Sequence, residues 1–381
     1  PSASLVHDLK IKYPFLQHFI SIFATWSYSL YYVLAELWGS SMISLLFWQF
    51  ANDIIKTSEA KRFYAMFGLI ANFALIAAGL CGKLYYKLSL MLAGDSNPYL
   101  YTVMLNLGSV IISGLSLIAI YRWVNTKVLT DPNHYQPTTE EKPRKTKKKM
   151  SIKDSFVILF KSKYLGLIAA LVVCYGMSIN IIEVLWKNQV NQQFPTPNEY
   201  NNFMQNLSIG TGAFTILVIL TSKNIVRKFG WFKGAITTPL IMLLTGVLFF
   251  TFVFFENLLN PITSFFGISA LLLSVWIGTL QNILAKGVKY GLFDPTKEMA
   301  YIPLTKDLKT KGKAAVDVIG SRIGKAGGGY IVSLLLFTGS LDSIAPILSI
   351  FVLVAIFIWL NSVKFLSNLY QKKLVETQDS Q

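Results

Sequence analysis

Residues 320–329 read GSRIGKAGGG, and they place two cations, Arg322 and Lys325, three positions apart in a segment apolar enough to cross a membrane. An arginine or lysine near the centre of a bilayer costs at least about 2.5–3.5 kcal/mol, so such residues usually face a bundle interior or an aqueous cavity. On an α-helix the two side chains share one face, where together they could hold a multivalent phosphate group. The stretch therefore predicts a membrane protein that binds an anion.

The composition of the whole chain supports this interpretation. The 381 residues are 53% hydrophobic and only 14% charged, and the mean hydropathy is +0.49. A soluble domain carries about 25% charged residues. Only two cysteines are present, Cys81 and Cys174, and both lie in apolar runs, so disulfides do not organise the fold. The composition predicts an all-α, polytopic bundle of membrane helices.

Apolar runs of about 20 residues, the length that crosses a bilayer, occur nine times along the chain. They lie in residues 23–50, 63–86, 99–123, 156–186, 203–226, 231–255, 265–285, 314–337 and 344–363.

The formal net charge of +16 reflects where the basic residues lie relative to these runs. Alternate loops, namely residues 51–62, 122–163, 223–233, 286–313 and the tail from 364, hold 28 of the 35 lysines and arginines, and the opposite loops hold 5. This alternation follows the positive-inside rule, so these loops and the C-terminus are predicted to be cytoplasmic. The charge is thereby explained without nucleic-acid binding, which we exclude.

The long polar loop divides the chain unequally. We expect residues 1–121 to hold the last three spans of an N-terminal bundle, residues 122–155 to form a basic cytoplasmic linker, residues 156–365 to form a six-span C-terminal bundle, and residues 366–381 to form a cytoplasmic tail. Transporters are often built from two six-helix halves joined by such a loop. We therefore expect three further spans ahead of Pro1, so that nine of twelve are present.

Three more ionisable residues, Glu36, Glu183 and Asp317, lie at membrane depth. The two glutamates could be counter-charges of Arg322 and Lys325 in a substrate site, or they could form salt bridges that only join helices. Lys187 follows Glu183 by one helical turn and could simply pair with it. Both interpretations remain open.

Amides and glycines in the same spans allow two readings as well. Gln281 and Asn282 could bind a nucleobase or pack at a helix interface, and Asn180 shares the helix face of Glu183. Gly320, Gly324 and Gly328 recur every four residues, which is typical of membrane helices that approach closely. Further on, Asp294 followed by Pro295 predicts the N-cap of a short helix in the loop 286–313.

Enzymatic constellations are absent from the predicted spans. The three histidines, His7, His18 and His134, all fall outside them, so a histidine proton relay or a histidine metal site is not available there. We expect neither an enzyme nor a resident cofactor or metal.

Several longer strings resemble one known family. These are AELWGS (35–40), LFWQFAN (46–52), EAKRFY (59–64), FPTPNEY (194–200), FDPTKEMAYIPL (293–304) and KGKAAVDV (311–318). They are similar to the ATP/ADP translocases, the nucleotide transporters of plant plastids and obligate intracellular bacteria, and the resemblance covers roughly residues 13–370.

The resemblance implies twelve transmembrane helices in a major-facilitator-like arrangement and obligate exchange of nucleotides. Charged residues that matter for transport in the family match Glu36, Glu183 and Lys325, whereas Arg322 rests on its placement beside Lys325. The resemblance implies a nucleotide and the lipid bilayer as partners.

The leading hypothesis is an antiporter that exchanges external ATP for internal ADP, functional as a monomer. Many Lys, Asn, Ile and Phe residues favour a bacterial cytoplasmic membrane over a plastid inner envelope. The alternatives are a paralogue that carries GTP, CTP, UTP or NAD, a proton-coupled nucleotide importer, and a non-transporting remnant of a truncated gene.

Overall fold

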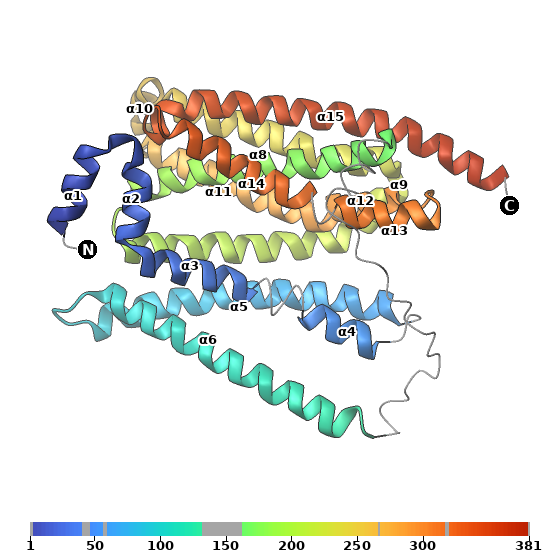
Figure 1. Ribbon diagram of the computed structural model, residues 1–381, viewed down its shortest axis with the longest axis horizontal. Coiled ribbons are helices and arrows are strands. Elements are labelled where there is room, and N and C mark those ends of the chain that lie inside the picture. The colour runs from blue at the N-terminus through green and yellow to red at the C-terminus, as the bar shows by residue number, and fades with distance from the viewer. Residues whose placement is uncertain are drawn as a thin grey trace. The chain divides into compact units, whose positions relative to one another are not determined.

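The computed structural model describes residues 3–39, 46–55, 59–131, 162–265, 267–316 and 320–379. Throughout these ranges the secondary structure is helical, without a strand (Figure 1). The chain divides into two compact units, Pro1–Gly68 and Leu69–Gln381. The predicted helical bundle is confirmed. Asp317 and most of the predicted linker 122–155 lie outside the described residues.

The first unit consists of short helices. In chain order they are α1 (Ala3–Lys12), the 3₁₀ turn η1 (Pro14–Leu16), α2 (Gln17–Ala24), α3 (Trp26–Gly39) and α4 (Trp48–Ile54), followed by the start of α5 (Ala60–Leu92). Aromatic rings join α4 to α5: Trp48 meets Tyr64 edge-on with ring centroids 5.1 Å apart, and the Tyr64 hydroxyl donates a hydrogen bond to Asn52. These contacts hold the two helices together.

The second unit contains the remaining helices. They are α6 (Pro98–Trp123), the π-turn η3 (Val124–Val128), α8 (Lys163–Gln193), α9 (Pro197–Phe254), α10 (Glu256–Phe265), α11 (Ala270–Val288), the π-turn η4 (Lys289–Phe293), α12 (Asp294–Ala300), α13 (Lys306–Ala315), α14 (Ser321–Leu335) and α15 (Leu341–Asp379).

Seven helical segments among the described residues are long and apolar enough to cross a membrane. They are Arg62–Leu92, Pro98–Val128, Lys163–Gln193, Pro197–Ser222, Asn224–Phe254, Ala270–Ala300 and Leu341–Val375. Each overlaps one of the nine predicted spans. The other two, 23–50 and 314–337, include residues 40–45 and 317–319, which lie outside the described ranges.

Two spans share the element α9, which is interrupted at Gly230. The backbone there has φ 81° and ψ 172°, a left-handed conformation that glycine adopts without steric cost. At its other end α9 is capped by Thr196, whose Oγ1 accepts from the backbone N–H of Glu199 at 3.3 Å and donates to Glu199 Oε2 at 2.6 Å.

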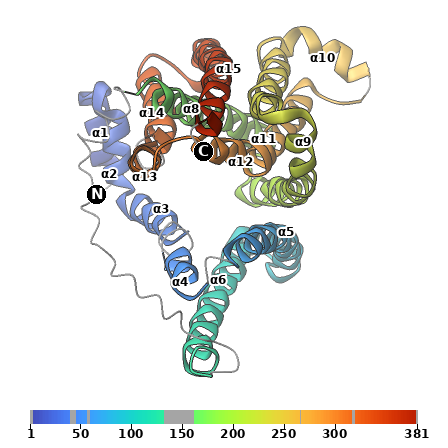
Figure 2. The same cartoon turned by 90° about the vertical axis from the view of Figure 1, so that its right-hand side faces the viewer.

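Helix α8 is the most buried helix of the second unit. It packs against α11, α14 and α15, and the end-on view shows it among them (Figure 2). The fully buried Trp186 donates from Nε1 to the Val275 carbonyl of α11 at 3.0 Å. Tyr175 stacks on Phe293 at 5.4 Å, and Trp359 of α15 meets Tyr175 edge-on at 5.8 Å. Side chains along α8 are therefore held in fixed positions.

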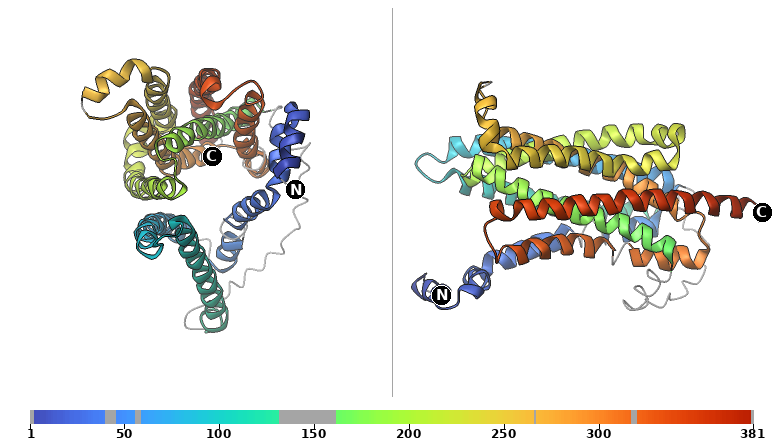
Figure 3. Two further views of the ribbon diagram at one scale, coloured as in Figure 1. Left: turned by 90° about the vertical axis from the view of Figure 1, so that its left-hand side faces the viewer. Right: turned by 90° about the horizontal axis from the view of Figure 1, so that it is seen from above.

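Helix α14 packs against α8 in the second unit (Figure 3), and glycines on both helices allow their backbones to approach closely. A Cβ added at Gly324 would lie 2.8 Å from the Val173 carbonyl oxygen, and one added at Gly176 would lie 3.1 Å from the backbone nitrogen of Lys325. At Gly328 the Met177 oxygen would be 3.1 Å away, whereas at Gly320 the nearest atom would be at 3.7 Å. The predicted packing role thus holds for Gly324 and Gly328.

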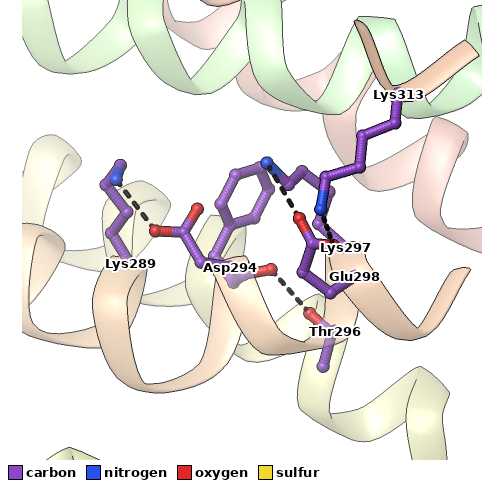
Figure 4. A network of polar contacts seen from close by, with 7 residues as sticks. Lys289, Asp294, Thr296, Lys297, Glu298 and Lys313 are labelled. Atoms are coloured by element: carbon purple, nitrogen blue, oxygen red, sulfur yellow. Dashed lines mark hydrogen bonds and ion pairs between the residues drawn. The ribbon is translucent and has the colours of Figure 1, made fainter. Parts of the chain in front are cut away.

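The segment after residue 285 is not the predicted loop. Helix α11 continues through η4 into α12, so the helical segment that contains the apolar run extends to Ala300. Asp294 has helical φ/ψ of −62° and −46°, so the N-cap prediction for it was wrong. Its carboxylate pairs instead with Lys289 at 2.9 Å across the π-turn (Figure 4). This contact favours continued helix over a loop.

Side chains from other helices fix the end of this segment. Trp231 donates from Nε1 to the Thr296 carbonyl at 2.8 Å, and the Tyr164 hydroxyl donates to the Ala300 carbonyl at 2.7 Å. Glu298 pairs with Lys313 of α13 at 2.6 Å (Figure 4). As a result, Lys286 and Lys289 lie in a continuous helical segment and not in a loop.

The close approach of α8 and α14 can be tested by replacing glycine with alanine at two positions of α14 in separate variants. We expect Gly324→Ala to lower the melting temperature of the purified protein by several degrees, because overpacking against backbone costs about 1–3 kcal/mol. Gly327→Ala is the matched control, since its Cβ would meet only the Met177 side chain at 3.7 Å. Thermal unfolding in detergent measures both. Equal melting temperatures for the two variants would contradict the glycine contact.

Candidate functional site

The site is built around the carboxylate of Glu183 on α8. Its Oε1 lies 3.0 Å from Lys187 Nζ, one turn further along the same helix, and its Oε2 lies 3.5 Å from Lys286 Nζ on α11. The side chains of Glu183 and Lys286 are each 26% exposed, whereas that of Lys187 is 44% exposed. We refer to Glu183, Lys187 and Lys286 as the charge triad.

A third cation belongs to the surroundings of the charge triad. Lys325 of α14 is close enough to Lys286 for their like charges to interact. The glycine contact with Gly176 fixes the Lys325 backbone against α8. Two ammonium groups therefore share the Glu183 carboxylate, a third lies nearby, and this part of the bundle carries an excess of positive charge.

The predicted cation pair lies on the exposed side of α14. Arg322 and Lys325 are both exposed, whereas Gly324 and Gly328 on the same helix are buried against α8. Among the described residues, Glu183 pairs with Lys187 and Lys286 and not with these two cations. The structure thus contains the Glu183–Lys187 ion pair, which was one of the two interpretations of the sequence.

Glu36 lies in the other compact unit. It is an exposed residue of α3. Within the second unit the structure pairs Glu183 with Lys286 and places Lys325 near Lys286.

Two of the three predicted amides, Gln281 and Asn282, are buried in α11, and Asn180 of α8 is half-buried. Asn282 donates from Nδ2 to the Gly278 carbonyl at 2.9 Å, but its Oδ1 has no hydrogen-bond partner among the described residues. The same is true of Asn180 Oδ1 and of both amide atoms of Gln281, which is fully buried. Leaving a buried polar group unpaired costs about 1–3 kcal/mol, so these amides are suited to binding a further polar group.

Lys286 is the residue of the candidate site that sequence reasoning missed. It was assigned to a cytoplasmic loop, since it directly follows the apolar run 265–285. Helical periodicity could have found it, because Lys286 lies one turn after Asn282 and continues its face. The partner Glu183, about one hundred positions earlier, carries no local signal for the pair.

The arrangement is suited to holding a multivalent anion. Lysines bind phosphate through charge-assisted hydrogen bonds, and the carboxylate holds two of them in place when no anion is bound. Within the described residues no cluster of three His, Cys, Asp or Glu side chains could hold a metal ion. The chemistry present is binding of negative charge inside a membrane bundle.

Comparison with known proteins gives the same family as the motifs. A profile of the TLC ATP/ADP transporter family matches residues 1–370. The ADP,ATP carrier protein 1 of Chlamydia pneumoniae is 46% identical over 373 residues, which cover 97% of this chain and 72% of that protein. The carrier of the same name from Rickettsia bellii is 43% identical over 99% of this chain and 76% of its own length.

A plant relative extends the comparison. The chloroplastic ADP,ATP carrier protein 1 of Arabidopsis thaliana is 43% identical over 91% of this chain and 55% of that protein. No solved structure matches the chain. The match over residues 1–370 and the identities above 40% show that this multi-pass membrane protein belongs to the TLC ATP/ADP transporter family.

Proposed function

We propose that this chain exchanges external ATP for internal ADP across a bacterial cytoplasmic membrane by alternating access. The family and its carriers named for ADP and ATP support the exchange. The observation that carries the proposal is the charge triad with Lys325 beside it, because the apolar spans contain more cationic than anionic groups at this point. A nucleotide phosphate chain supplies the missing negative charge.

The phosphates bind between Lys286 and Lys325, with Arg322 as a second contact on the face of α14. Glu183 holds Lys187 and Lys286 while the carrier is empty and gives up part of that contact when phosphate arrives. Each charge-assisted hydrogen bond contributes about 1.5–3 kcal/mol. A few such bonds give a micromolar to millimolar affinity, which permits release on the other side.

The same charges explain why transport is an exchange. An empty carrier that changes sides must move lysines whose positive charge is only partly compensated, and unpaired charges in a low-dielectric interior are costly. A bound nucleotide neutralises them and lowers that cost. The carrier therefore changes sides quickly when loaded with ATP or ADP and slowly when empty.

We assign recognition of the nucleobase to the amide side chains of Gln281, Asn282 and Asn180. Gln281 and Asn282 lie in the same helix as Lys286, four to five positions before it, and Asn180 lies one turn before Glu183. Their unpartnered amide atoms can donate to and accept from the edge of a purine.

The architecture proposed for transport has two halves, residues 1–121 and 156–365, joined by the linker 122–155 and followed by the tail 366–381. This chain supplies nine of twelve major-facilitator-like spans and works as a monomer with its C-terminus in the cytoplasm. Glu36 supplies a counter-charge from the N-terminal half. The positive-inside distribution of lysine and arginine supports this orientation.

Counter-exchange in liposomes tests the function directly. Labelled ATP should enter liposomes preloaded with ADP and should hardly enter empty ones. Lys286→Gln and Lys325→Gln should each slow the exchange at least about tenfold, since each removes one charge-assisted bond to phosphate. Lys364→Gln, which removes an exposed lysine of α15, is the control and should leave the rate unchanged. Equal uptake into empty liposomes would refute an exchange mechanism.

A double-mutant cycle tests whether Glu183 and Lys286 act together. Each single substitution, Glu183→Gln or Lys286→Gln, should lower stability, and the double variant should lose less than the sum by about 0.5–3 kcal/mol. Chemical or thermal unfolding in detergent provides the free energies.

The control for that cycle pairs Glu183→Gln with Lys364→Gln. Asp342 near the start of α15 accepts a hydrogen bond from Asn188, close to Glu183 in α8, and Lys364 lies about 33 Å further along α15. The two effects should therefore add within about 0.3–0.5 kcal/mol. Additivity in both cycles would mean that the 3.5 Å contact contributes nothing.

A further inference from the structure

A polar pocket of about 560 Å³ lies where α8 ends and α9 begins. It falls within the size range of about 300–1,000 Å³ that small-molecule sites occupy. Six lining residues carry polar groups suited to a nucleotide, and none of them was singled out for binding by the sequence: Tyr99, Lys187, Asn191, Tyr200, Asn201 and Gln205.

The walls of this pocket are held in place by specific contacts. Asn198 at the start of α9 accepts from Thr102 Oγ1 of α6 at 2.8 Å, and this bond fixes α6 near Tyr99. Gln205 donates from Nε2 to Asn201 Oδ1 at 2.7 Å. A Cβ added at Gly82 of α5 would lie 2.4 Å from the Gln205 side chain, so α5 also restrains that amide. The polar groups are therefore preorganised, which lowers the entropic cost of binding.

Lys187 connects this pocket with the charge triad. The same ammonium that lines the pocket lies 3.0 Å from the Glu183 carboxylate. Glu183 also contacts Lys286 of α11. A displacement of Lys187 therefore alters the contact between this carboxylate and α11.

We propose that this pocket is an entry site for the transported nucleotide, distinct from the central site among the spans. The phosphates bind Lys187, the base packs against Tyr99 or Tyr200, and the amides of Asn191, Asn201 and Gln205 supply hydrogen bonds. Phosphate at Lys187 competes with Glu183 for the same ammonium. Loading of the entry site thereby loosens the triad before the nucleotide moves inward.

This inference rests on the proposed function and orientation, which place the pocket on the external face. In the opposite orientation the same chemistry would serve the internal nucleotide. A reagent applied from one side of the membrane distinguishes the two, and occupancy at the pocket can be measured without transport.

The experiment uses cysteine protection in reconstituted liposomes at 4 °C, where the transport cycle is slow. Asn191→Cys is introduced after Cys81→Ser and Cys174→Ala, and a membrane-impermeant methanethiosulfonate reagent is added outside. External ATP or ADP should slow the labelling at least about fivefold, because Asn191 lines the pocket. Asn188→Cys is the control: Asn188 bonds Asp342 of α15 instead, and its labelling should not change.

Variants of Lys187 test the phosphate contact. Lys187→Gln should raise the ATP concentration needed for protection about tenfold, the effect of losing one charge-assisted bond, and Lys187→Arg should restore most of it. Lys87→Gln removes an exposed lysine of α5 that does not line the pocket, and it should have no effect.

Each remaining outcome decides one point. If wild-type liposomes exchange ATP for ADP but Asn191→Cys is not protected, the entry site is refuted and the proposed function stands. Inorganic phosphate protecting as well as ATP would overturn the nucleotide assignment, and adenosine protecting as well as ATP would overturn the role of Lys187. Absence of exchange in the wild type would refute the proposed function itself.

Discussion

The structure depends on the contact of one carboxylate with two lysines inside apolar helices. Removing a charge from water costs several kcal/mol, so each charge in a membrane bundle needs compensation. Glu183 compensates Lys187 and Lys286 only in part, because one negative charge faces two positive ones and Lys325 adds a third. Packing alone cannot remove this excess. A mobile anion can, and nucleotides are multivalent anions.

Helix packing determines where the excess positive charge lies. The glycine contact between α8 and α14 places the Lys325 backbone against Gly176, and a side chain at either glycine would separate the helices. On α11 the chain continues through a π-turn, a feature that often occurs at functional sites, and Lys289 and Asp294 pair across it. Both features fix the positions of helix backbones that carry lysines. The aromatic contacts of Tyr175, Phe293 and Trp359 fix the surrounding core.

Sequence reasoning predicted what depends on local pattern. Hydrophobic length predicted the helices, spacing offered the Glu183–Lys187 pair as one of two interpretations, and the four-residue glycine repeat predicted a close helix contact without naming its partner. It failed where a distant partner decides. Nothing in the sequence near Lys286 reveals that Glu183 lies beside it. Asp294 followed by Pro295 predicts a helix cap, whereas in the structure Asp294 pairs with Lys289 across a π-turn that local sequence does not indicate. The pocket that Tyr99 and Tyr200 line likewise needs the fold, since its walls come from three helices.

Sharing of Lys187 between the pocket and the triad has a necessary consequence. Its ammonium cannot make its best contact with the Glu183 carboxylate and with a phosphate at the same time. Coupling between two equilibria is reciprocal, so if phosphate at the entry site weakens the triad, an intact triad must weaken phosphate binding by the same factor. A conformation that separates Glu183 from Lys187 would then bind external nucleotide more tightly. In the proposed mechanism the substrate phosphate and the Glu183 carboxylate bind Lys187 in turn. Binding of nucleotide at the entry site therefore changes the contact of Glu183 with Lys286 on α11.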